Sequence, residues 1–408
     1  MKRRQFLQTG AALSLAAPFY TRAAFAEDPI RIAQIHDASG GLDIYGLPMI
    51  EMLRYAVEQK NAAGGVLGRP IELIDYDPQS NLQYYTQYAT EAATRDRVAA
   101  VFGGITSASR EAIRPILRRY GVPYFYATNY EGGVCDRNIF ITASTPGQSI
   151  STLMPFAAQN FGKRVYIVAA DYNFGHLSAE WVRKFATDLG LEVINASFFP
   201  LDVTDFGAEL QKIQSEKPDF VFSALVGGAH LSFYRQWAAA GLNETPIVSS
   251  TFGGGNEQVL LSPTESRNIY SAYAYYEDVD NPANATFVEA FRATERAKKV
   301  PYINELGMMT YCSFELWTKA VERAGTTERM PVIEALEAEG RFDGPAGQLI
   351  MDPKTHHTAL NIYVAQANGA RFDILEEHKA LPPLETAMQC DLVANPDDTE
   401  QYIVRIAK

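Results

Sequence analysis

Cysteine is scarce in this chain of 408 residues, which contains only Cys135, Cys312 and Cys390. No Cys-x-x-Cys pair occurs, which excludes thioredoxin-like chemistry, and three cysteines are too few for a fold built on disulfides. An odd number also leaves at least one thiol unpaired within a monomer.

Other chemical signatures are missing as well. No Ser-His-Asp order, phosphate-binding loop or zinc-ligand spacing stands out, and the glycine runs lack the dinucleotide fingerprint. His356 and His357 are adjacent, so on a strand they point to opposite faces and cannot hold one metal together. We therefore expect neither an enzyme nor a bound cofactor.

Basic runs and long apolar runs are also lacking. The net charge is −12, which argues against nucleic acid or an anionic membrane as a partner. After residue 26 no apolar run approaches the roughly 20 residues that a membrane helix needs. The composition therefore favours a soluble globular protein.

The first 26 residues have the features of a secretory signal peptide. Lys2, Arg3 and Arg4 precede an apolar stretch, and Ala24-Phe25-Ala26 is a small-x-small cleavage site. Two arginines followed by Gln, Phe and Leu favour the twin-arginine route, with an ordinary Sec signal as the alternative. No Cys stands at the cleavage site, so we expect a free periplasmic protein that begins at Glu27, without a lipid anchor.

Export would place the chain in an oxidising compartment, which permits a disulfide. Cys135 lies in a loop after a glycine pair, and Cys390 lies in the loop-rich C-terminal part. Cys312 lies among residues with helical spacing. We predict that Cys135 pairs with Cys390 and that Cys312 is a buried thiol.

Short apolar strands alternate with helices along most of the chain, which indicates βαβ units and parallel sheets covered on both faces. A pause near residues 143–146 divides the pattern into two sets, so we predict two doubly wound α/β lobes. The aromatic and then polar segment Tyr270–Pro282 suits a crossover between them. Strands are expected at Ile30–Ile35, Ile71–Tyr76, Val98–Phe102, Val122–Tyr126, Val165–Ala170, Leu191–Phe199, Phe220–Leu225, Ile247–Ser250, Gln348–Met351, Ala359–Ala365 and Phe372–Leu375. Helices are expected at Ser107–Tyr120 and near residues 283–298, 306–324 and 331–338.

Several segments resemble one family of proteins. Residues 61–73, Asn-Ala-Ala-Gly-Gly-Val-Leu-Gly-Arg-Pro-Ile-Glu-Leu, and the late turn Phe342–Gly347 are similar to type I periplasmic solute-binding proteins of branched-chain amino acid importers. Within that family, Tyr126–Gly132, Ala274–Pro282 and Met351–His357 resemble segments of the amide and urea binders. Ala127 departs from the Pro that those binders carry.

The resemblance implies two Rossmann-like lobes joined by three crossovers, with a small-molecule solute trapped between them. It assigns residues 27–144 and 277–352 to lobe one, residues 145–276 and 353–385 to lobe two, and residues 386–408 to a tail. It also implies a monomer that delivers its solute to a membrane permease of an ABC importer. The alternative is an amide-sensing regulator of the same fold, for which an export signal would have no use.

In lobe one, the resemblance places the ligand at residues that follow strand ends, where open α/β sheets bind ligands. Ser107, next to Ile105 and Thr106, would donate its hydroxyl to a carbonyl or carboxylate, or these residues only cap a helix. Tyr126 and Thr128 match the amide binders, although Tyr126 has a core aromatic as its alternative role. Tyr45 matches a tyrosine that borders the site in amino-acid binders.

In lobe two, Tyr172 and Phe174 match paired aromatics that close over an amide or urea, or else pack as surface-loop aromatics. Two departures follow. Val226-Gly227-Gly228 replaces a more polar stretch, and the segment around Gly254 stands where amino-acid and urea binders place an acid for the ligand's nitrogen. An unpaired buried ammonium is costly. We therefore expect a small amide-like or carboxylate-bearing solute with an apolar portion, and an amino acid only if Glu131 or another acid reaches its amine.

Overall fold

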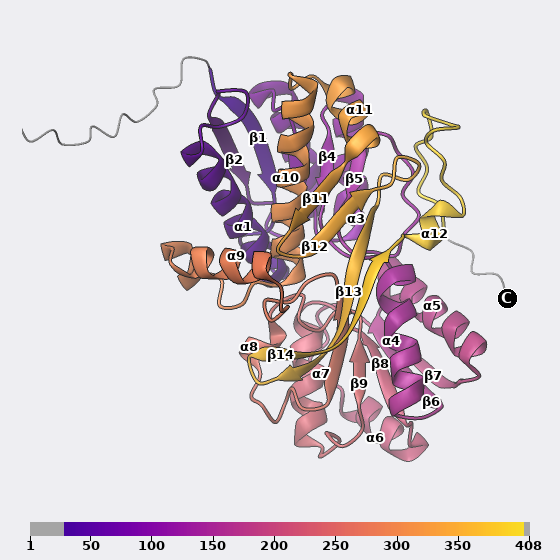
Figure 1. Ribbon diagram of the computed structural model, residues 1–408. Coiled ribbons are helices and arrows are strands. Elements are labelled where there is room, and N and C mark those ends of the chain that lie inside the picture. The colour runs from indigo at the N-terminus through magenta and orange to yellow at the C-terminus, as the bar shows by residue number, and fades with distance from the viewer. Residues whose placement is uncertain (1–27, 404–408) are drawn as a thin grey trace, which may run out of the picture.

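The computed structural model describes residues 28–403 and arranges them as two α/β lobes, one above the other in Figure 1. The expected signal peptide lies outside the described residues. Within residues 28–403, no helix combines the length and the apolar character needed to cross a membrane.

The first lobe is built on a five-stranded parallel sheet in the order β2-β1-β3-β4-β5. Its strands are short, apolar and mostly buried, as a sheet covered on both faces requires. They are β1 (Ile30–Ile35), β2 (Ile71–Tyr76), β3 (Val101–Gly103), β4 (Tyr124–Tyr126) and β5 (Ile139–Ile141).

Helices cover both faces of this sheet. α1 and α10 pack against each other over one face, and α2 and α3 cover the other, where Tyr85, Ile113 and Leu117 join the core of the sheet. The helical segments are α1 (Asp43–Ala62), α2 (Leu82–Glu91), the π-helical turn η1 (Ala92–Asp96), α3 (Ser107–Tyr120), α9 (Pro282–Arg292), the 3-10 turn η2 (Glu295–Lys298), α10 (Glu305–Ala324) and α11 (Arg329–Glu339).

The second lobe contains a larger, mixed sheet. β10, β9, β8, β6 and β7 run parallel, and β13 adds an antiparallel strand beside β10, with β14 and β12 paired to it. These strands are β6 (Arg164–Ala170), β7 (Glu192–Phe199), β8 (Phe220–Ala224), β9 (Ile247–Ser249), β10 (Ile269–Tyr273), β11 (Arg341–Gly344), β12 (Gly347–Met351), β13 (Thr358–Asn368) and β14 (Arg371–Leu381). β11 and β12 form the end of this sheet that packs on α10 and α11 of the first lobe.

Helices also cover the second sheet on both faces. α4 and α5 pack together on one face, while α6 and α7 bury Leu210, Phe233 and Trp237 against the other. The helices are α4 (Pro146–Asn160), α5 (Asn173–Leu189), α6 (Gly207–Glu216), α7 (Gly228–Ala239), α8 (Glu257–Leu260) and α12 (Leu384–Ala387). The predicted α/β class with two doubly wound lobes is confirmed.

Three crossovers connect the lobes, at residues 142–145, 274–281 and 352–357, and the chain returns to the first lobe once more after β14. The prediction that Tyr270–Pro282 is wholly a crossover is wrong in its first part, because residues 270–273 belong to β10. All five residues of β10 are buried, and the strand lies between β9 and β13 as an internal strand of the second-lobe sheet. Only the part from Ala274 onward connects the lobes.

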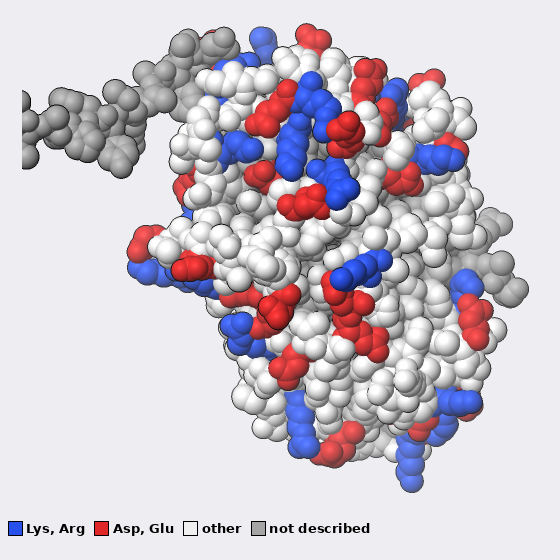
Figure 2. Space-filling view, in the orientation of Figure 1, with Lys and Arg blue, Asp and Glu red and all other residues white. Residues whose placement is uncertain are grey.

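The predicted cysteine pairing is confirmed. Cys135 and Cys390 form a disulfide across 255 positions, and Cys312 is a buried free thiol in α10. The surface is mixed in charge. Acidic and basic side chains are interspersed on the face that Figure 2 shows, which leaves wide uncharged areas between them.

Candidate functional site

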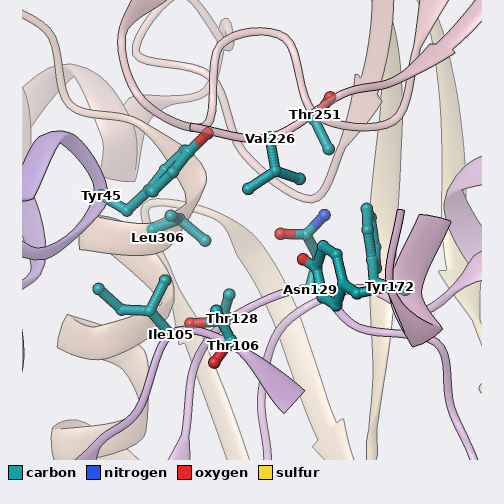
Figure 3. Close-up of a pocket in the computed structure, with 10 residues that line it drawn as sticks. Tyr45, Ile105, Thr106, Thr128, Asn129, Tyr172, Val226, Thr251 and Leu306 are labelled. Carbon is teal, nitrogen blue, oxygen red and sulfur yellow. The ribbon is translucent and has the colours of Figure 1, made fainter. Parts of the chain in front are cut away.

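A small cavity lies between the two lobes, at the carboxyl ends of their strands (Figure 3). Most of its walls come from loops that leave β3 and β4 in the first lobe, and β6, β8 and β9 in the second. This is the position at which open α/β sheets bind ligands. Its lining residues are Tyr45, Ile105, Thr106, Thr128, Asn129, Tyr172, Phe174, Val226, Thr251 and Leu306.

Seven of the ten residues predicted from the sequence line this cavity, and they come from both lobes. They are Tyr45, Ile105, Thr106, Thr128, Tyr172, Phe174 and Val226. The other three, Ser107, Tyr126 and Gly254, lie close in the chain to lining residues, but the structure gives their polar groups other partners.

Ser107 opens α3 and is directed toward a buried acid. Its Oγ donates a hydrogen bond of 2.5 Å to Oε2 of Glu131. The cap of the helix is Thr106, whose hydroxyl oxygen accepts from the backbone N–H of Ser109 at 3.1 Å. The hydroxyl proton of Ser107 is therefore already used within the lobe.

Tyr126 and Gly254 do not line the cavity, but each makes a hydrogen bond that holds a loop of its wall. The Tyr126 hydroxyl donates to the carbonyl oxygen of Ile105 at 2.8 Å, and its ring is fully buried. The carbonyl oxygen of Gly254 accepts a hydrogen bond of 2.7 Å from Nδ2 of Asn304. Both residues thus fix loops that reach the cavity.

Glu131 does not offer a free acid to the cavity. Its side chain is 3% exposed, and besides Ser107 it meets Arg110, whose Nη2 lies 3.4 Å from Oε1. Arg110 is itself fully buried and lies over the rings of Tyr126 and Tyr130, at 5.3 Å and 4.4 Å from their centroids. The buried carboxylate and the buried guanidinium compensate each other.

A second buried acid lies behind the glycine loop of the second lobe. Glu257 is fully buried, and its carboxylate accepts the backbone N–H groups of Gly253 at 2.7 Å and Gly255 at 3.1 Å. Nδ1 of His230 is 3.2 Å from its Oε1. Glu257, two residues after these glycines, was not predicted as part of the site. Glu257 shapes the loop and does not line the cavity.

Among the described residues that line the cavity, none has a charged side chain. Hydroxyls of Thr106, Thr128 and Thr251 and the amide of Asn129 provide polar groups. Tyr45, Tyr172 and Phe174 provide aromatic surface. The rings of Tyr172 and Phe174 stack with their centroids 6.0 Å apart. Small-molecule sites commonly combine apolar walls with a few polar groups in this way.

Two hydrogen bonds join the lobes at the rim of the cavity. The backbone N–H of Gly227 donates to the Tyr45 hydroxyl at 3.0 Å, and Nδ2 of Asn129 donates to the carbonyl oxygen of Ser250 at 3.1 Å. Each pairs a first-lobe side chain with second-lobe backbone. The structure therefore shows the lobes drawn together over the cavity.

Three lining residues were not predicted: Asn129, Thr251 and Leu306. Asn129 follows Thr128 directly, and Thr251 follows the end of β9 by two residues, so position after a strand end was the available signal for both. Leu306 is the second residue of α10, far along the chain from the other first-lobe walls. Nothing in its local sequence distinguishes it from a core leucine.

Four helices begin at the cavity. α3 starts directly after Thr106, α5 directly after Tyr172 and α7 two residues after Val226, while Leu306 is in the first turn of α10. Helix N-termini present unpaired N–H groups and the positive end of the helix dipole. The cavity therefore favours a carboxylate or a carbonyl oxygen over a cation.

The adjacent histidines support the connection between the lobes. Nε2 of His356 is 3.1 Å from Oε1 of Glu337, and the His357 ring contacts the hydroxyl of Tyr130. Burial lowers the pKa of His357 to about 3, so it is neutral. The described part of the chain holds no group of three or more His, Cys, Asp or Glu side chains placed to bind a metal ion.

Comparison with known proteins places this geometry in context. A family model described as periplasmic binding protein matches residues 29–371. A leucine-, isoleucine-, valine-, threonine- and alanine-binding protein of Pseudomonas aeruginosa is 25% identical over 351 residues, which cover 84% of this chain and 91% of that protein.

Solved structures share the fold. A solute-binding protein of an ABC transporter from Rhodopseudomonas palustris BisB5, in complex with 3,4-dihydroxybenzoic acid, has a TM-score of 0.78 at 22% identity and covers 88% of this chain and 99% of its own. A branched-chain amino acid transporter substrate-binding protein of Streptococcus pneumoniae, in complex with isoleucine, has a TM-score of 0.77 at 23% identity, with coverages of 86% and 99%.

Proposed function

Because the chain belongs to the periplasmic binding protein family, we propose that it is the solute-binding component of an ABC importer. It would be exported, capture one small solute between its lobes and present the closed form to a membrane permease as a monomer. The interlobe cavity supports this proposal, and the relatives are likewise binding proteins and not enzymes. Recovery of mature protein beginning at Glu27 from the periplasmic fraction would test the export step.

We further propose that the solute carries a carboxylate or amide and an apolar, preferably aromatic, portion. The observation that carries this proposal is a cavity with threonine hydroxyls and helix N-termini, aromatic walls and no charged lining side chain. An α-amino acid would bury an ammonium group without an acid to meet it, because Glu131 and Glu257 already have partners. The dihydroxybenzoate complex of a protein with the same fold is consistent with this preference.

Amides and ureas remain within the proposal because Tyr126–Gly132 resembles the corresponding segment of amide binders. Three ligands distinguish which chemical group enters the cavity. Benzoate and benzamide share one ring and differ in charge, whereas leucine adds an α-ammonium group. Each should be titrated into refolded, ligand-free protein by calorimetry.

We expect benzoate or benzamide to bind and to raise the melting temperature by mass action, which at a hundredfold excess over Kd corresponds to about 2.7 kcal/mol. Leucine should bind far more weakly. Tight leucine binding without any response to benzoate or benzamide would overturn the ligand preference and leave the importer assignment standing.

A further inference from the structure

The C-terminal part of the described chain returns from the second lobe to the first. β14 ends at Leu381 in the second lobe. The segment 384–402, which we name the C-terminal strap, begins with α12 against α4 of the second lobe and then runs along the first lobe (Figure 1, yellow). The disulfide from Cys390 ties it to Cys135, whose backbone N–H also donates to the carbonyl oxygen of Glu400 at 2.9 Å. The strap is thus joined to the first lobe both covalently and by backbone pairing.

A row of arginines on α3 holds the strap. Arg110, Arg114 and Arg118 recur every fourth residue, so they lie on one face of the helix. Each donates to an oxygen of the strap: Arg110 to Oε1 of Gln401 at 2.7 Å, Arg114 to the carbonyl of Thr399 at 2.7 Å, and Arg118 to the carbonyl of Asp398 at 3.2 Å.

Arg110 connects this row to the wall of the cavity. It is fully buried, and its Nη2 reaches both Gln401 in the strap and Glu131 in the loop after β4. The same loop carries Thr128 and Asn129, which line the cavity. The loop 128–131 therefore has the cavity on one side and groups held by the strap on the other.

Two glycines allow the strap to approach this loop. Gly132 and Gly133 have φ values of 85° and 92°, which favour glycine. A Cβ atom on Gly133 would lie 2.1 Å from the carbonyl oxygen of Tyr402. Gly133 instead accepts a hydrogen bond of 2.8 Å from the Tyr402 N–H and donates one of 3.2 Å to Oγ1 of Thr386.

We propose that the C-terminal strap positions the first-lobe wall of the cavity, with Arg110, Gly133 and the Cys135–Cys390 disulfide as its points of action. The inference rests on the proposed solute cavity. The strap touches no lining residue in the contacts described above and acts through the loop 128–133. Freed of the strap, this loop would lose the hydrogen bonds that hold Gly132, Gly133 and Cys135 on its outer side.

Hydrogen exchange on the full-length, ligand-free protein tests directly whether the strap positions the loop 128–133. Cys390→Ser opens the disulfide, Gly133→Ala disturbs the close approach while leaving the cysteines in place, and Val393→Ala changes a strap side chain that is 66% exposed. We expect about tenfold faster exchange at residues 127–134 in the first two variants, with β8 unchanged, because local opening need not involve the other lobe. Val393→Ala should match wild type.

Acceleration confined to residues 384–402 would overturn the proposal, because the strap would then only rest on the surface. Faster exchange in β8 as well would also overturn it, since that pattern reports general destabilisation. Should Cys390→Ser fail to fold, Gly133→Ala and wild-type protein reduced under native conditions provide the same readout.

Benzoate affinity gives a second readout at a temperature where all variants are folded. Cys390→Ser and Gly133→Ala should bind benzoate about tenfold more weakly, a loss of about 1.4 kcal/mol, and Val393→Ala should bind as wild type does. A wild-type protein that does not bind benzoate would count against the proposed ligand class alone, because the exchange measurement uses no ligand and still decides the role of the strap.

Discussion

The two walls of the cavity each depend on a buried acid, but the acids are held differently. In the first lobe, Glu131 is paired with the buried Arg110 and accepts a hydrogen bond from the hydroxyl of Ser107. In the second, Glu257 is held by backbone N–H groups of the glycine loop, with His230 beside it. The first wall is thus organised by long-range side-chain contacts and the second by a local loop.

The two arrangements have the same consequence for the solute. Glu131 and Glu257 are both committed to the protein's own groups, and neither lines the cavity. The negative charge that an ammonium group requires is therefore used in building the walls. What faces the solute is neutral and lies at the N-termini of four helices, which suits a carboxylate or a carbonyl.

The largest effect is expected from the replacement of Glu131, the acid that compensates the buried charge of Arg110 in the first-lobe wall. Glu131→Ala should lower the free energy of unfolding by about 3–5 kcal/mol, because it leaves the guanidinium of Arg110 buried without its partner. Urea unfolding measures this change. Glu91→Ala, which breaks the exposed pair with Arg95, is the matched control and should cost less than about 1 kcal/mol. Equal effects of the two variants would contradict the structural role of Glu131.

Glu305, a buried acid at the connection between the lobes, should make the stability of the fold depend on pH. Glu305 accepts backbone N–H groups of Ser144 and Ala274, which lie in the first and second crossovers, and burial raises its pKa to about 7 from 4.5. Between these values the folded state keeps a proton that the unfolded state has lost, so stability falls as pH rises from about 4.5 to 7.

Glu305→Gln cannot titrate and should escape this loss. The free energy of unfolding of Glu305→Gln minus that of wild type should rise by about 3 kcal/mol between pH 4 and pH 8, at 1.36 kcal/mol for each pKa unit. Thermal unfolding across this range gives the difference. A gap that stays constant with pH would show that Glu305 titrates normally.

Glu257→Gln should weaken the second wall by a smaller amount. The neutral side chain retains one acceptor oxygen where the carboxylate has two, so the Gly255 N–H, which meets both oxygens at 3.1 Å and 3.2 Å, loses one of them, at about 1.5–3 kcal/mol for a hydrogen bond to a charged group. The loss should appear as faster hydrogen exchange at residues 252–256. Unchanged exchange there, with normal overall stability, would mean that the glycines hold the loop alone.

The smallest effect concerns the contact between the walls. Tyr45→Phe removes the hydroxyl that accepts the Gly227 N–H, which should cost about 1–2 kcal/mol of the closed form. Stopped-flow measurements with benzoate should show faster dissociation with little change in the association rate. Tyr120→Phe, at a residue that is 44% exposed, should leave both rates unchanged; a wild-type dissociation rate in Tyr45→Phe would assign closure to the solute alone.

The sequence predicts best what depends on local pattern. Helical spacing and short apolar runs in the sequence identify β1, β2 and α3 with their observed bounds. The position after strand ends identifies most of the cavity lining. Strand starts are less well predicted, since the run from Val98 enters the sheet only at Val101. Ala99 and Ala100 before it already exchange backbone hydrogen bonds with Arg31 and Ala33 of β1, so the apolar run does not mark where the regular pairing begins.

What depends on distant partners could not be predicted from the sequence. Ser107 appeared to be a ligand donor because its partner, Glu131, lies 24 positions away in a loop whose path the sequence does not define. The strap contacts join residues more than 250 positions apart. Leu306 reaches the cavity only because α10 packs on α1.

The most direct test of the account is native mass spectrometry of protein purified without denaturation, followed by identification of any solute released on unfolding. We expect one bound molecule per chain that carries a carboxylate or amide and an apolar or aromatic portion, without an α-ammonium group. Leucine or another free α-amino acid in the released fraction would contradict it.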